Sequence, residues 1–188
     1  MKQLLAFIFL TVALYANSGG PGQGYANNAP NFNNCTSCHN GTQNSGDGSV
    51  FFTGLPNSYV PGETYTIGVT VTGANERGFG FQAAVQSGND VAGEILLNSS
   101  SSNAEINGDY IQHSSRTTSG SWVFDWIAPS TDLGEVTFSV SGLATGGSSS
   151  TSGDDVYTSS EVIPSQIPLD VTGLLFSCLL YTSDAADE

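Results

Sequence analysis

Basic residues are almost absent from this chain. Lys2, Arg77 and Arg116 are its only lysine and arginine residues, against 17 acidic residues, and the formal net charge is −14. Nucleic acids and anionic lipids are bound through clusters of Lys and Arg, so the composition argues against both as partners. The negative charge is typical of a soluble exported protein, and it would also suit docking to a basic redox partner.

Catalytic sequence motifs are missing as well. The chain has no Gly-x-Ser-x-Gly nucleophile turn, metalloprotease helix, phosphate-binding loop or dinucleotide fingerprint. It also has no segment with the periodicity of an amphipathic helix. The sequence therefore predicts a protein that is not an enzyme.

Long apolar runs are confined to the N-terminus. Lys2 is followed by an apolar run that opens at Leu4 and ends near Leu14, and the residues after it are small or polar. Such a run is too short to span a bilayer and has the layout of a secretory signal. Residues 1–18 are predicted to be a signal peptide, with cleavage after Ala16 or Ser18, so the mature chain is expected to be extracytoplasmic, either secreted or at the cell surface.

The segment Cys35-Thr36-Ser37-Cys38-His39 has the Cys-x-x-Cys-His spacing of c-type haem attachment. Each of two thiols at this spacing can form a thioether with one vinyl group of the porphyrin. The adjoining imidazole then becomes the proximal ligand of the iron. We therefore expect one covalent haem c, held by Cys35, Cys38 and His39, and a role in extracytoplasmic electron transfer.

Other chemistries remain open for Cys35 and Cys38. In an oxidising compartment two nearby cysteines can form a disulfide, and a close pair can also be a redox-active dithiol. A thioredoxin-like site would open a helix in a βαβ unit, and that pattern is missing here. A zinc site would need a fourth ligand.

The sixth ligand of such an iron has few candidates. Met1 is the only methionine and leaves with the predicted signal, which rules out His/Met ligation. His113 is the only histidine besides His39, so it is the one residue of the chain that could complete a bis-histidine metal site. The alternative is that His113 is a solvent-facing polar residue on a strand.

Residues 19–48, which carry the Cys-x-x-Cys-His segment, are rich in Gly and Asn and show no periodicity, so we expect an irregular loop. A haem on such a loop needs an apolar wall. The nearest aromatic residues are candidates for that wall or for ordinary packing against the sheet: Tyr25, Phe32, Phe51 and Phe52.

Residues 49–163 show the alternation of β-strands. The segments 65–71 and 121–126 alternate apolar and polar residues with period two, and further strands are predicted at 78–85, 136–140 and 156–162. Weaker candidates are 94–97 and 110–113. Without helices between them, these strands predict an all-β fold: an immunoglobulin-like antiparallel β-sandwich of about seven strands, preceded by the irregular loop.

Calcium is not expected. The acidic turns at Asp47-Gly48 and Asp154-Asp155 lack the ligand spacing of a calcium loop. Turn formation explains Asp-Gly pairs equally well.

Five longer segments are distinctive in combination with the Cys-x-x-Cys-His segment: Pro56–Tyr65, Gly78–Gln82, Tyr110–His113, Trp122–Pro129 and Ser152–Thr158. Together they resemble the choice-of-anchor V domain of exported bacterial proteins, which is similar to the reelin-type N-terminal module. The resemblance covers roughly residues 19–162. It implies an extracellular or cell-surface β-sandwich with a Cys-x-x-Cys-His segment and a variable anchor, and it implies no reaction.

The C-terminal residues 178–188 look like a translated sequencing adapter, so Cys178 is not expected to be a ligand or disulfide partner. Residues 164–177 then form a linker toward a missing region, and any membrane attachment would come from an anchor in that region.

The sequence is therefore compatible with two functions. The first is an exported mono-haem domain that exchanges electrons with a redox partner protein or surface component of unknown identity. The alternative is a structural or adhesive cell-surface module in which Cys35 and Cys38 form a disulfide and no haem is bound.

Overall fold

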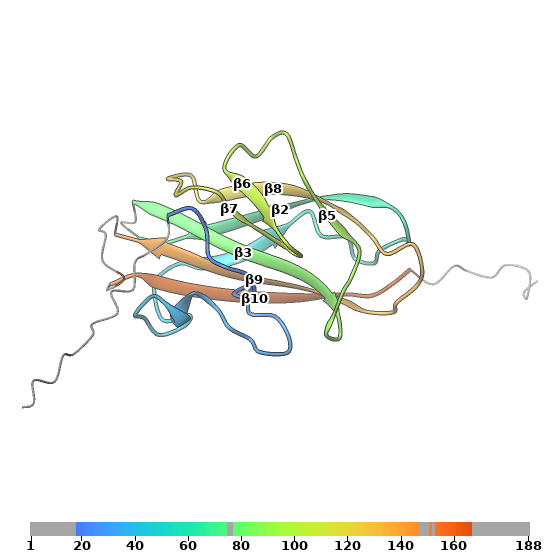
Figure 1. The fold of residues 1–188 in the computed structure, drawn as a ribbon, viewed down its shortest axis with the longest axis horizontal. Helices are drawn as coiled ribbons and strands as arrows, with labels where there is room; N and C mark the ends of the chain where they lie inside the picture. Colours follow the sequence, from blue (N-terminus) through green and yellow to red (C-terminus); the bar gives the residue numbers. More distant parts are fainter. Residues whose placement is uncertain (1–17, 75–76, 147–150, 152, 167–188) are drawn as a thin grey trace, which may run out of the picture.

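The computed structural model of the protein describes residues 18–74, 77–146, 151 and 153–166, and nearly all regular structure there is β (Figure 1). The predicted signal peptide, apart from Ser18, and the predicted adapter lie outside these residues. The strands are β1 (Ser49–Thr53), β2 (Thr64–Thr72), β3 (Gly78–Ser87), β4 (Asp90–Val91), β5 (Glu94–Leu97), β6 (Ala104–Asn107), β7 (Tyr110–His113), β8 (Ser121–Ile127), β9 (Val136–Thr145) and β10 (Asp155–Ile163).

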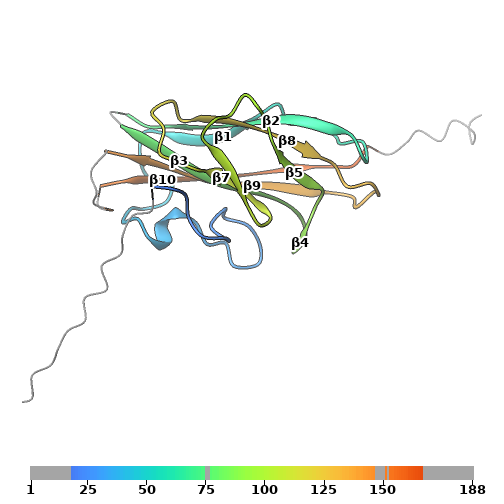
Figure 2. The same ribbon diagram turned by 45° about the horizontal axis from the view of Figure 1, so that its top comes forward.

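These strands form two sheets that pack face to face (Figures 1 and 2). One sheet has the order β1-β2-β8-β5, and the other has the order β10-β9-β3-β7-β6 with the short β4 beside β3. Neighbouring strands pair antiparallel throughout. The predicted all-β antiparallel sandwich is confirmed. It has ten strands in the described residues where about seven were expected. The three strands that were not predicted are β1, β4 and β6, of which β4 and β6 are too short for their alternation to be recognised in the sequence.

The core side of the smaller sheet follows the period-two pattern. In β8, Trp122, Phe124 and Trp126 are buried while the residues between them are more exposed. The register pairs Trp122 with Val69 and Phe124 with Ile67 of β2, so the two strands present one continuous apolar row.

Aromatic rings fill the space between the sheets. The Trp126 ring packs edge-to-face on Phe138 of β9, with centroids 4.9 Å apart, and on Tyr59, with centroids 5.7 Å apart. All three side chains are fully buried. Replacing one such residue by alanine costs about 3–5 kcal/mol of folding free energy in typical cores.

The central strands β3 and β9 are buried on both faces. Their inner face meets the core, and residues 18–48 lie along their outer face, as Figure 2 shows for the blue leader segment beneath β9 and β10. We call residues 18–48 the leader. Because the leader covers the outer face, polar residues there must find partners within the protein.

Gln82 of β3 provides the main attachment of the leader. Its Oε1 accepts from the Tyr25 backbone N–H at 2.6 Å, and its Nε2 donates to Gly22 O and to Gln112 Oε1, both at 2.7 Å. Gln82 is 0% exposed, so these bonds replace the water that it loses on burial.

Within the described residues, no helix is long and apolar enough to cross a membrane.

Candidate functional site

The Cys-x-x-Cys-His segment lies on the leader as one turn of 3₁₀ helix, η1 (Cys35–Ser37). Asn34 caps this turn, because its Oδ1 accepts from the Thr36 backbone N–H at 3.0 Å, and Asn is among the residues that favour this position. The Cys35 carbonyl accepts from the backbone N–H groups of Cys38 and His39 at 3.2 and 2.9 Å. Cys38 follows the turn directly as its C-cap.

Cys35 is held against the sheet by Ser141 of β9. The Ser141 hydroxyl accepts from the Cys35 backbone N–H at 3.1 Å and lies 3.1 Å from the Cys35 Sγ, to which it donates. Burial raises the pKa of the Cys35 thiol from 9.0 to about 11, and the hydrogen bond from Ser141 offsets only part of that effect. Cys35 is therefore a protonated and weakly nucleophilic thiol at neutral pH.

Cys38 differs from Cys35 in being exposed to solvent. Both residues are free thiols, so the disulfide expected under the alternative hypothesis is not formed here. The Cys35 sulfur is engaged by Ser141 on the sheet instead, while Cys38 lies outside. The pair therefore combines one sheltered thiol and one accessible thiol.

His39 is fixed by a carboxylate from the far end of the chain. Its Nδ1 lies 2.7 Å from Oδ2 of Asp154, just before β10, and the two side chains are 15% and 4% exposed. A carboxylate on Nδ1 sets the orientation of an imidazole and directs its Nε2 lone pair outward, as is common behind metal-bound histidines. Asp154 thereby orients the residue predicted to be the proximal ligand.

His113, at the end of β7, is 8% exposed, so the expectation that it faces solvent was wrong. Its Nδ1 lies 3.0 Å from both the backbone N and the backbone O of Phe81. The ring fits over Gly80, where an added Cβ would lie 2.7 Å from the imidazole. The His113 side chain therefore hydrogen-bonds with the backbone of β3 at the point where the backbone pairing of β7 with β3 ends.

Burial lowers the pKa of His113 below its ordinary value of 6.5, against opposite effects of the Phe81 backbone and Glu105. The charge of His39 lowers this pKa a little further. The two histidines, 74 positions apart by their numbers, are thus within electrostatic range of each other. In the described part of the chain, however, no group of three His, Cys, Asp or Glu side chains could hold a metal ion.

The residues of this segment match the attachment and ligand end of a c-type haem site more closely than its apolar wall. Two free thiols and an oriented imidazole are present at the iron end. Of the four aromatic residues expected to form an apolar wall, Phe52 packs on Phe138 instead, with centroids 5.8 Å apart, while Phe51 and Phe32 are 41% and 60% exposed. Phe52 is therefore not available to cover a porphyrin face.

Ser141 and Asp154 were not predicted as partners of the Cys-x-x-Cys-His segment. They lie 106 and 115 residues away from Cys35 and His39, and no local pattern marks a serine on a strand or an aspartate in a turn for this purpose. Only the pairing of β9 and β10 and the path of the leader bring them together.

Comparison with known proteins places the fold. A family model described as "Reeler domain" matches residues 32–145. The crystal structure of the Reelin-N domain of F-spondin is similar, with 18% identity and a TM-score of 0.51 over 68% of this chain and 93% of that chain. The human F-spondin reeler domain (fragment 1) is 20% identical, with a TM-score of 0.47 over 67% of this chain and 95% of that chain.

No curated protein matches this chain. At 18% identity, the Reelin-N domain of F-spondin supports the fold of this chain and nothing more. The reelin-like part of the resemblance seen in the sequence is confirmed, and the narrower choice-of-anchor V assignment stays a prediction.

Proposed function

The chain belongs to the Reeler domain family, and on that premise we propose that it is a structural or adhesive β-sandwich module displayed outside the cytoplasm of a bacterium. The observation that carries the proposal is the family match over residues 32–145 on a two-sheet sandwich. Reeler domains occur in extracellular proteins, which agrees with the secretory signal expected at residues 1–18.

The way the leader is attached supports a role as a stable scaffold. Gln82, Ser141 and Asp154 each bind the leader through a side chain that is at most 4% exposed. Irregular segments bound in this way present a fixed surface and resist proteolysis. A surface module needs both properties.

Protease treatment of intact cells tests the location. The full-length chain, produced in an exporting bacterium and detected with an antibody, is expected to be released or cleaved from intact cells. A cytoplasmic protein followed in the same samples serves as the control and should stay whole. Cleavage of the chain only after lysis would contradict the proposal.

A binding assay tests the adhesive role. The purified exported chain, coated on beads, is expected to retain cells of the producing bacterium, whereas beads coated with the heat-unfolded chain should not. Equal retention by both kinds of bead would contradict an adhesive role, and the structural role of the module would then be the part of the proposal that stands.

The second candidate function is covalent binding of one haem c, with Cys35 and Cys38 as attachment sites and His39 as the proximal ligand. It is favoured by the Asp154 carboxylate 2.7 Å from His39 Nδ1 and by the two free thiols. A bound haem would supply one-electron chemistry, and the acidic surface would favour a basic redox partner. Attachment would require the porphyrin vinyl group to reach the Cys35 sulfur, which is sheltered beside Ser141.

The visible spectrum tests this second candidate. The full-length chain is produced together with cytochrome c maturation proteins and then denatured. A Soret band that persists in the denatured wild type and is lost in Cys35→Ser/Cys38→Ser would support covalent haem, and Ser37→Ala is the matched control that should keep it. A wild type without the band would exclude covalent haem.

A further inference from the structure

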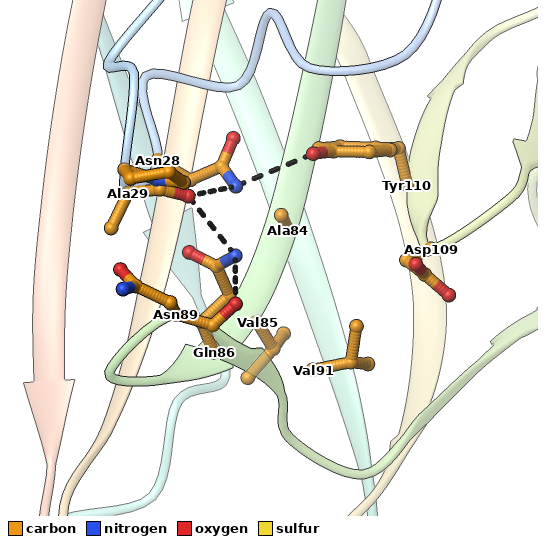
Figure 3. Close-up of a pocket in the computed structure, with 10 residues that line it drawn as sticks. Asn28, Ala29, Ala84, Val85, Gln86, Asn89, Val91, Asp109 and Tyr110 are labelled. Carbon is orange, nitrogen blue, oxygen red and sulfur yellow. Dashed lines mark hydrogen bonds between the residues drawn. The ribbon is translucent and has the colours of Figure 1, made fainter.

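A recess lies away from the cysteines, where the leader meets the β3–β4 hairpin and β7. It is a pocket of about 200 Å³ between the leader turn at residues 28–30 and the strands (Figure 3). None of the described residues that line it is a cysteine or histidine. It is therefore separate from the Cys-x-x-Cys-His segment.

Hydrogen bonds between the lining residues hold this pocket open. Gln86 Nε2 donates to Ala29 O at 3.2 Å and to Asn89 O at 3.5 Å, which joins the leader turn to the hairpin. Asn28 Nδ2 donates to the Tyr110 hydroxyl at 3.4 Å across the top of the pocket, as the dashed lines in Figure 3 show. The walls are thus fixed before any ligand arrives, which lowers the entropy cost of binding.

The pocket combines an apolar floor with a polar rim. Ala84 and Val85 of β3 are 4% and 3% exposed, and Val91 of β4 is 48% exposed. Asn89 and Asp109 line the pocket and are exposed to solvent, so both side chains are accessible to a ligand. Figure 3 shows the Tyr110 ring edge-on above Val91, with Ala84 behind.

The polar groups select the chemistry of the ligand. No described residue that lines the pocket is basic, and Asp109 is acidic, so an anion would be repelled. An ammonium group would use only acceptors and would leave the Asn89 amide N–H groups and the Tyr110 O–H unused. Amides and a phenol both donate and accept, which matches the hydroxyl groups of an uncharged sugar, while the apolar floor matches its C–H groups.

The volume limits the size of the ligand. Pockets for drug-sized molecules measure roughly 300–1,000 Å³, and this one is smaller at about 200 Å³. The space suits one monosaccharide unit and is too small for a haem.

The leader turn carries a second unusual feature. Phe32 is 60% exposed and has a φ of 53°, a left-handed conformation that is uncommon for a bulky residue. Its N–H donates to Asn28 O at 2.9 Å, so the same turn that forms the pocket wall imposes this conformation. Strained residues of this kind concentrate at binding sites, and an exposed aromatic ring is a suitable surface for the apolar face of a sugar.

We propose that this pocket binds a single neutral sugar residue of a surface glycan. The proposal rests on the adhesive function proposed above and names the class of its partner. Phe32 is the candidate to contact the next sugar along the chain.

Titration of the exported full-length chain with monosaccharides tests the proposal. The neutral probes are mannose, galactose and N-acetylglucosamine, and the charged probes are glucuronic acid and glucosamine. We expect saturable binding of at least one neutral sugar and none of the anionic one. Stronger binding of glucosamine than of the neutral sugars would overturn the choice of ligand. Titration with an unrelated peptide is a further probe, and binding of that peptide without binding of any sugar would overturn it too.

Variants locate the binding. Asn89→Ala and Tyr110→Phe each remove a hydrogen-bonding group from the pocket and should weaken sugar binding about 3- to 10-fold. Asn57→Ala, at an exposed position outside the lining, is the matched control and should leave binding unchanged. Thermal unfolding of each variant confirms that the fold is retained.

Two results would overturn the pocket as a glycan site: no binding of any neutral sugar, or binding that Asn89→Ala and Tyr110→Phe leave unchanged. The bead assay separates this failure from failure of the proposed function. Cells retained without sugar binding would leave the adhesive module standing and remove only its glycan partner.

Discussion

The Asp154 carboxylate lies 2.7 Å from Nδ1 of His39 and ties the leader to the start of β10. The two residues are 115 positions apart, and the contact is largely sheltered from water. It gives His39 one fixed orientation, whether the imidazole binds a metal or only secures the leader.

Replacing Asp154 by Asn should destabilise the fold. The amide keeps the size of the carboxylate and loses the charge-assisted hydrogen bond to His39, so we expect the free energy of unfolding to fall by about 1–3 kcal/mol. Urea denaturation measures the change. Asp155→Asn, one residue along and more exposed, is the matched control, and an equal loss in both variants would contradict a specific role for Asp154.

The two cysteines should react with alkylating reagents at different rates. Burial raises the pKa of Cys35 to about 11, so very little thiolate forms at pH 8, whereas Cys38 is exposed. Iodoacetamide labelling followed by peptide mapping should find Cys38 modified first, with Cys35 catching up as the pH approaches 11 or when urea unfolds the chain. Equal rates in the folded protein at pH 8 would rule out the sheltered Cys35.

Acid should weaken the fold partly through His113. Its pKa is lowered in the folded protein from an ordinary value of 6.5, so below that pH the unfolded chain binds the proton more readily. The stability that His113 contributes is therefore present above about pH 6.5 and lost as the pH falls, by at most about 1.4 kcal/mol per pH unit.

His113→Asn tests this source, because the Asn Oδ1 can accept from Phe81 N–H in place of Nδ1 and does not titrate. The free energy of unfolding of the variant should depend less on pH between 6.5 and 5 than that of the wild type. Parallel curves for the two proteins would assign the acid sensitivity to other groups.

Loss of Gln82 should loosen the leader. Gln82→Ala leaves the Tyr25 N–H and Gly22 O without their partner, and each buried group left unsatisfied costs about 1–3 kcal/mol. Limited proteolysis should cut the variant within residues 18–34 sooner than the wild type. Gln23→Ala, an exposed glutamine of the same leader, should resist like the wild type; if the two variants were cut equally fast, Gln82 would not be the anchor.

The sequence predicts most clearly those strands that have one buried face and one exposed face. In β2 and β8 the alternation of apolar and polar residues is itself the burial pattern, because successive side chains of a strand point to opposite faces. In β3 and β9 both faces are buried. Alternation cannot reveal this, since the covering of the second face comes from the leader.

The candidate site also has a part that the sequence predicts and a part that only the fold creates. Its chemistry is local, since two cysteines and a histidine within five residues define what the segment could bind. Which of these groups is available is not local, because Ser141 covers one thiol and Asp154 orients the imidazole from more than 100 residues away.

By itself, then, the sequence determined an acidic all-β chain with a Cys-x-x-Cys-His turn, because charge, period-two alternation and motif spacing are properties of neighbouring residues. Only the tertiary structure decided that His113 is buried, that the leader closes the outer face of the larger sheet, and that a pocket opens beside Tyr110. Each of these depends on contacts between segments far apart in the chain, and antiparallel pairing of β3, β7, β9 and β10 is what creates them.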